Sequence, residues 1–302
     1  MPIALIPYQG ETLALAAAIV WAVAVILFKK SGETVHPIGL NLFKDVLAAI
    51  LFVPTLWIVE GYVFLPAPWQ DYALLLASGA LGIGIADTLF FMCLNRLGAG
   101  LTAIVDCLYS PFIIGLSMLW LGEILSALQI LGVILIISAV LTATYSPRDG
   151  SITRRNLLLG VTYGVLAMAL MALGIVMIKP LLNRSPLLWV TEVRLLGGVV
   201  VLVLVLVFHR ARRPILTSIY SAGGKVYTLT GSLIGGYLAM VVWLAGMKFT
   251  MVSTAAALNQ TTNIFIFILA AIFLREKITV QKTVGIILAV CGALLVTFAR
   301  TQ

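Results

Sequence analysis

Long apolar runs separated by short polar stretches dominate the chain. A helix needs about 20 mostly apolar residues to cross the hydrocarbon core of a bilayer. Ten runs meet this requirement, at residues 12–30, 38–59, 72–95, 98–121, 125–145, 156–178, 187–208, 226–247, 251–273 and 279–299. The runs are continuous, whereas the strands of a membrane barrel alternate between apolar and polar residues. The pattern therefore predicts an all-α integral membrane protein with ten transmembrane helices.

The composition supports this interpretation. Of the 302 residues, 62% are hydrophobic and 10% are charged, whereas a soluble domain has about half and about a quarter. The formal net charge is +8, but the basic residues are scattered between apolar runs, so no nucleic-acid partner is expected. The three cysteines lie within apolar runs and the two histidines are far apart in sequence. We therefore expect no disulfide framework, no metal site and no cofactor.

The distribution of lysine and arginine predicts the orientation. Of the 19 basic residues, 13 follow the odd-numbered spans, four lie on the opposite side, and two, Lys44 and Arg194, lie within spans. Loops on the cytoplasmic side carry the excess of positive charge. Both termini are therefore expected outside the cytoplasm, in a chain that is integral to the inner (plasma) membrane.

An internal repeat divides the chain. Residues 120–123 (WLGE) resemble residues 273–276 (FLRE), and the same offset of 153 residues pairs Gly82 with Gly235. The spacing predicts two five-helix units, at residues 11–145 and 156–300. Because five is an odd number, the second unit must enter the membrane from the opposite side, which makes the repeat inverted.

The doubled pattern combines a proline-started second span that carries a cation, a fourth span rich in small residues, a Leu-Gly-Glu or Leu-Arg-Glu ending, and a glycine-bearing fifth span. The first copy is Pro37 to Lys44, 99–103, 120–123 and Gly132, and the second is Pro186 to Arg194, 252–256, 273–276 and Gly285. This arrangement resembles the EamA-type transporter family of the drug/metabolite transporter superfamily, over about residues 11–300. The resemblance implies a ten-helix carrier, often an exporter of amino acids, amines or other metabolites in the bacterial inner membrane.

Six charged residues lie away from the ends of the predicted spans, and each is a candidate for function because a charge at the bilayer centre costs about 2.5–3.5 kcal/mol. A rise of about 1.5 Å per residue puts Lys44, Asp87 and Asp106 in one layer nearer the cytoplasm. Glu192 and Arg194 lie in a second layer nearer the outside, and Asp45 is expected to be a structural partner.

Two interpretations of these charges remain open. In the functional one, Asp87 or Asp106 binds a proton or a cationic group of the substrate, and Lys44 and Arg194 hold a carboxylate or close a gate. In the structural one, Lys44 pairs with either aspartate and Arg194 pairs with Glu192. Two further acids, at positions 123 and 276, lie at span ends, where we expect structural caps or loop pairs.

Five consecutive polar residues, 259–263, lie in the middle of the ninth span. Asn259 and Asn263 are four residues apart and are expected on one helix face. Such residues either line a water-filled cavity or bond to neighbouring helices. Tyr109 lies on the matching face of the fourth span, while Trp21 and Tyr237 are placed at mid-depth, where they either build an aromatic box or pack against helices.

These features predict a secondary carrier of a small polar metabolite that works by alternating access, with a central cavity between the two repeats. The substrate is expected to contact Trp21, Asp106, Tyr109, Tyr237, Asn259 and Asn263, and coupling or gating is expected at Lys44, Asp87, Glu192 and Arg194. An amino acid is the first expected substrate, with export the expected direction. An amine or quaternary ammonium compound is the second, and a passive channel is the rival class. Protons are a candidate coupling ion, membrane lipid is the surrounding partner, and no enzyme activity is expected.

Overall fold

The computed structural model describes residues 8–121, 126–144, 152–220, 223–249 and 258–298. Within these ranges, seven helical stretches are long and apolar enough to cross a membrane, and three shorter apolar helices accompany them. The long ones are Gln9–Ser31, Pro37–Glu60, Trp69–Leu97, Ala99–Trp120, Arg154–Leu182, Leu187–Phe208 and Lys225–Gly246, and the short ones are Ala127–Ala143, Leu258–Phe273 and Val280–Val296. The prediction of a helical membrane protein is confirmed, whereas the count of ten spans stays a prediction.

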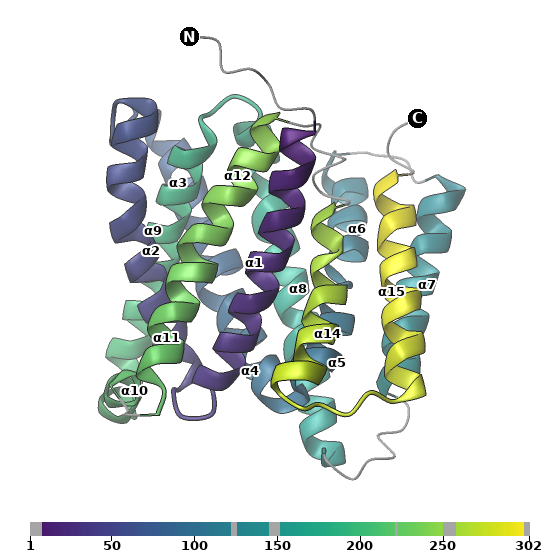
Figure 1. Ribbon diagram of the computed structural model, residues 1–302. Coiled ribbons are helices and arrows are strands. Elements are labelled where there is room, and N and C mark those ends of the chain that lie inside the picture. Colours follow the sequence, from purple (N-terminus) through teal and green to yellow (C-terminus); the bar gives the residue numbers. More distant parts are fainter. Residues whose placement is uncertain (1–7, 122–125, 145–151, 221–222, 250–257, 299–302) are drawn as a thin grey trace.

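The elements follow one another along a bundle (Figure 1). Those of the first half are α1 (Gln9–Ser31), α2 (Pro37–Glu60), α3 (Trp69–Gly79), the π-helix η1 (Ala80–Ile85), α4 (Ala86–Leu97), α5 (Ala99–Asp106), α6 (Tyr109–Leu121) and α7 (Ala127–Thr144). Those of the second half are α8 (Arg154–Leu182), α9 (Leu187–Phe208), α10 (Arg212–Ile219), α11 (Lys225–Gly231), the π-helix η2 (Ser232–Leu238), α12 (Ala239–Phe249), α14 (Thr262–Phe273) and α15 (Val280–Phe298). The start of α1 and the end of α15 lie at one end of the bundle, and α10 lies at the other.

Local sequence explains where α2 begins and ends. The His36 imidazole Nδ1 accepts a hydrogen bond from the Ile38 N–H at 3.3 Å, and Pro37 occupies the first helical position, where its missing N–H costs no helical bond. Gly61 ends the helix with φ of 77°, a left-handed conformation that glycine adopts without strain. These signals fix the entry of α2, the helix that carries the first buried cation.

The two π-helices lie at positions that the 153-residue offset pairs, because residues 80–85 correspond to residues 233–238. Each packs against a helix of the other half, η1 against α9 and η2 against α2. A π-helix shifts the backbone hydrogen-bond pairing by one residue, and such segments are frequent at functional sites. The two crossed contacts therefore join the halves through irregular helices. The inversion of the repeat stays a proposal.

The fourth span of each half is interrupted. The chain turns at Cys107–Leu108 between α5 and α6, and again at Thr261 before α14. Residues 251–257 of the ninth predicted span lie outside the described residues. The turn at Thr261 has a local cause, because its hydroxyl donates to the Leu258 carbonyl at 2.5 Å, a side-chain bond that competes with helical pairing. Asn259 and Asn263 therefore do not lie on one continuous helix, in contrast to the expectation from their spacing.

Candidate functional site

A buried ion-pair cluster joins α2 to α4. The Lys44 ammonium donates to Asp87 Oδ2 and lies 3.0 Å from Asp45 Oδ1. The Lys44 and Asp45 side chains are 6% and 0% exposed, and that of Asp87 is 17% exposed. The ammonium also lies 5.8 Å from the centre of the Phe91 ring. Buried charges persist when they are paired, so this cluster holds one cation against two carboxylates.

Arg194 has a different environment. Its Nε donates to the Ser78 hydroxyl at 3.0 Å, and that hydroxyl donates to the Gly174 carbonyl at 2.6 Å. A Cβ added at Gly82 of η1 would lie 3.3 Å from Arg194 Nη2, so a glycine leaves room for the guanidinium. Among the described residues, no carboxylate forms an ion pair with Arg194. Its positive charge interacts over a longer distance with Asp87 and Tyr109.

Glu192 does not neutralise Arg194, although both lie on α9. The Glu192 residue is 5% exposed, and its Oε2 has no hydrogen-bond partner among the described residues. The expected structural pair between the two is therefore not formed. Leaving a buried carboxylate oxygen without a hydrogen bond is costly, so Glu192 stays a candidate for coupling or gating.

The interrupted fourth spans meet at their breaks. The Asn263 amide donates to Cys107 Sγ at 3.3 Å and also interacts with the Asp106 carboxylate. The charge of Asp106 in turn acts on the Tyr109 hydroxyl, which also interacts with Arg194. Electrostatic interaction through Tyr109 thus extends between residues that the depth estimate assigns to two separate layers. This group, Asp106, Tyr109, Arg194 and Asn263, is called the central cluster below.

The other predicted contact residues have local partners. The Asn259 amide oxygen accepts from the Thr262 hydroxyl at 3.5 Å. The Tyr237 hydroxyl lies 2.6 Å from the Thr55 hydroxyl, and its ring packs edge-on against Phe52 with centroids 5.5 Å apart. The Trp21 ring packs against Phe28 in the same manner, at 6.3 Å. These contacts favour helix packing for both aromatic residues, and the aromatic box stays a prediction.

Sequence reasoning missed two polar residues that support the site. Asn41 is fully buried, and its amide donates to the carbonyls of Ile83 and Gly84 at 3.0 and 2.9 Å. These carbonyls belong to η1, so Asn41 stabilises the irregular backbone. Its position three residues before Lys44 puts it on the same helix face, which was the available signal. Ser78, which anchors Arg194, carries no comparable signal because a lone serine in an apolar helix is common.

Comparison with known proteins places this arrangement in a family. The model of the EamA-like transporter family matches residues 8–145 and 158–298. The chain belongs to the EamA-like transporter family. The resemblance inferred from the doubled motifs is thereby confirmed, and the protein is a membrane transporter rather than an enzyme.

Relatives of this EamA-like transporter carry similarly general names. A protein of Archaeoglobus fulgidus named "Uncharacterized transporter" is 25% identical over 292 residues, which cover 96% of this chain and 98% of that protein. "Uncharacterized transporter YetK" of Bacillus subtilis is 32% identical over 130 residues, 43% of this chain and 38% of that protein. A solved structure described as "Crystal structure of protein" matches 96% of both chains with a TM-score of 0.64 and 14% identity, and this likeness shows the fold alone.

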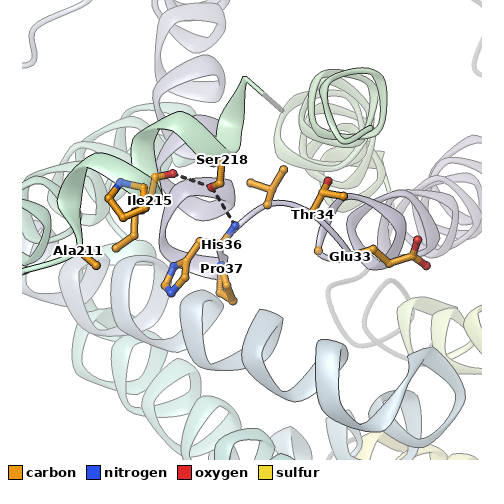
Figure 2. A pocket seen from close by; sticks show the side chains of 10 residues that line it. Glu33, Thr34, His36, Pro37, Ala211, Ile215 and Ser218 are labelled. Carbon is orange, nitrogen blue, oxygen red and sulfur yellow. Dashed lines mark hydrogen bonds between the residues drawn. The ribbon is translucent and has the colours of Figure 1, made fainter. Parts of the chain in front are cut away.

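A surface pocket of about 400 Å³ in this EamA-like transporter lies away from the central cluster. It is formed by the α1–α2 connection and by α10 (Figure 2), and residues 32–37, 211, 214, 215 and 218 line it. The Ser218 hydroxyl bridges the two segments, because it accepts from the His36 N–H at 3.1 Å and donates to the Ile215 carbonyl at 2.6 Å. No predicted site residue lines this pocket, so we assign it no part in substrate binding.

Proposed function

We propose that this transporter is a secondary carrier of amino acids, with export the proposed direction. The observation that supports this most strongly is the presence, in the central cluster, of one cation and one carboxylate that form no ion pair among the described residues. Arg194 and Asp106 both interact with Tyr109, and neither forms an ion pair among the described residues. A zwitterion is the small molecule whose charges match both groups.

The chemistry of each group suggests its role. The guanidinium of Arg194 is held through Nε by Ser78, which leaves Nη1 and Nη2 for a bidentate contact with a carboxylate. Asp106 would accept the substrate ammonium, and the Asn263 amide would orient Asp106. Arginine suits a planar bidentate contact better than lysine does, so Lys44, already paired twice, is assigned to a gate or coupling role.

Proton coupling fits two carboxylates. Asp87 is bound to Lys44 in this structure, and Glu192 has an unpartnered oxygen. Intramembrane carboxylates mark proton relays in transporters. In this proposal a proton carried by Glu192 or Asp87 is exchanged for the substrate, and the energy comes from an ion gradient.

Alternating access would occur between the units at residues 11–145 and 156–300. The contacts of α2 with η2 and of α9 with η1 join these units. Helix α2 carries Lys44, which lies against Gly236 of η2, and helix α9 carries Arg194, which lies against Gly82 of η1. A rocking motion would shift both cations at once, which couples the charge arrangement at the centre to the side on which the protein opens.

A second candidate substrate is an amine. Among the candidate site residues, four acids that are buried or partly buried (Asp45, Asp87, Asp106 and Glu192) face two cations, Lys44 and Arg194, and this surplus favours a positively charged ligand. The uncompensated Arg194 favours the zwitterion instead, because an amine gives it no partner.

A thermal-shift measurement on purified protein distinguishes these substrates. Each of the amino acids is compared with its decarboxylated amine and its deaminated acid, because a ligand that binds only the native state raises stability by RT ln(1 + [L]/Kd). The proposal predicts a shift for a zwitterion that is lost in both Arg194→Lys and Asp106→Asn and kept in Arg184→Lys, which alters an exposed ion pair with Asp71. A shift by the amine alone would favour the second candidate, and a shift retained in both cluster variants would place the binding site elsewhere.

A further inference from the structure

Glu276 connects the second half of the chain to the first at the start of α5. Its Oε1 accepts a hydrogen bond from the Ala99 N–H at 2.6 Å, and its Oε2 accepts one from the Gly100 N–H at 3.0 Å. These amides belong to the first turn of α5 and have no partner within the helix. A carboxylate at this position also lies at the positive end of the helix dipole. The contact is therefore a charge-assisted cap that joins Glu276 to residues 177 and 176 positions earlier in the sequence.

The backbone around α5 leaves a space that fits this carboxylate. Gly98 has φ of 80°, and a Cβ added there would lie 2.6 Å from Glu276 Oε1. A Cβ added at Gly100 would lie 3.0 Å from Oε2. Lys29 adds positive charge from α1, because its ammonium donates to the Asn95 carbonyl at 3.1 Å and interacts electrostatically with Glu276. The start of α5 and Lys29 of α1 thus both act on one carboxylate.

The chain after α14 adopts a strained turn to place Glu276 there. Arg275 has φ of 54°, a left-handed conformation that glycine adopts more readily than arginine. The Glu276 N–H donates to the Ala270 carbonyl at 3.2 Å, which closes the end of α14. The surrounding contacts hold a conformation that an isolated chain would disfavour.

We propose that Glu276 is a latch that closes the end of the transporter assigned to the cytoplasm and detaches when that end opens. This inference rests on the alternating access of the proposed function. The two halves separate on one side at a time in that mechanism, and a bond that crosses between them at this end must break on opening. Because α5 runs from the latch to Asp106, release of Glu276 frees the helix that carries a residue of the central cluster. A purely structural cap would stay bound in both states.

Cysteine labelling tests the latch without a substrate. Cys93 is fully buried, and its Sγ lies 3.7 Å from the hydroxyl of Thr102, one turn along α5 from the latch. The rate at which a membrane-impermeant maleimide labels Cys93 is measured by mass spectrometry in the full-length protein in proteoliposomes with the latch end accessible. The change Glu276→Gln removes the charge. The change Ala99→Pro removes one N–H donor at a position where proline suits a helix.

Both variants are expected to label Cys93 about tenfold to a hundredfold faster than the wild type, as the loss of a hydrogen bond to a charged group implies. Glu33→Gln, which alters an exposed pair with Lys30, and Arg275→Gly, which keeps the carboxylate, are expected to label at the wild-type rate. Labelling at the wild-type rate in both test variants overturns the proposal. The proposal is also overturned if hydrogen exchange in α3, near the opposite end of the bundle, rises as much as exchange in α5, because that would mark general unfolding. If no amino acid raises the melting temperature but both test variants still label Cys93 faster, only the proposed substrate is refuted.

Discussion

Replacing Lys44 by glutamine removes the only cation that the structure places within ion-pairing distance of Asp45 and Asp87 among the described residues. At the 3.0 Å that separates Lys44 Nζ from Asp45 Oδ1, Coulomb's law gives an attraction of about 5–6 kcal/mol at an effective dielectric constant of about 20. The cost of desolvation offsets part of this attraction. Measured losses on breaking a buried pair are about 3–5 kcal/mol, and we expect Lys44→Gln to fall in this range.

The change Asp87→Asn is expected to cost less, about 1.5–3 kcal/mol, because Lys44 keeps its bond to Asp45. Lys30→Gln is the matched control, since Lys30 and Glu33 form an exposed pair that contributes less than about 1 kcal/mol. Equilibrium unfolding in mixed detergent micelles, followed by tryptophan fluorescence, gives the three free energies. The reasoning is refuted if Lys44→Gln is as stable as Lys30→Gln, or more stable than Asp87→Asn.

Two further predictions concern packing and pH. A Cβ at Gly132 would lie 2.6 Å from the Gly292 carbonyl oxygen between α7 and α15, so Gly132→Ala is expected to cost about 1–3 kcal/mol in the same unfolding assay. Gly115→Ala, where nothing lies within 4 Å, should be neutral or stabilising by up to about 1 kcal/mol, and equal losses in both would contradict the account. Burial and then the neighbouring His209 lower the pKa of His36 from 6.5. The native state thus holds this proton less tightly than the unfolded state. The free energy of unfolding therefore has its full value above pH 6.5 and decreases as the pH falls toward the lowered pKa. His36→Asn keeps the cap but does not titrate, so melting temperatures from pH 8 to pH 5 should fall less steeply in this variant, and an unchanged slope would show that His36 is not responsible.

The apolar pattern predicted most of the helices because the membrane requires every spanning backbone to satisfy its own hydrogen bonds. It did not predict the interruptions at Cys107–Leu108 and Thr261. The turn at Thr261 accompanies a local bond from its hydroxyl to the Leu258 carbonyl, and the turn at Cys107–Leu108 precedes Pro111, which has no N–H for a helical bond. Neither feature changes the apolar pattern. The doubled motifs were more informative than any single residue, because they led to the EamA-like family.

The candidate site was predictable by residue type but not by partner. The free-energy cost of a charge inside the membrane drew attention to Lys44, Asp87 and Arg194, which the structure shows as buried or partly buried. The sequence could not show that Lys44 is paired twice, while Arg194 is hydrogen-bonded to Ser78 and has no ion pair within the described part of the chain. Glu276 was expected to be a cap at a span end, and the structure shows the helix it caps. The partner of each charged side chain depends on which helices pack together, and residue type and spacing alone do not reveal this.

Counterflow in proteoliposomes tests the central claim most directly. Vesicles are loaded with an unlabelled amino acid chosen by its thermal shift, and the uptake of the labelled compound is followed. The account predicts saturable uptake that internal substrate accelerates, abolished in both Arg194→Lys and Asp106→Asn and retained in Arg184→Lys. Uptake that neither saturates nor responds to internal substrate would indicate a passive channel, and full activity in both cluster variants would contradict the proposed recognition of a zwitterion.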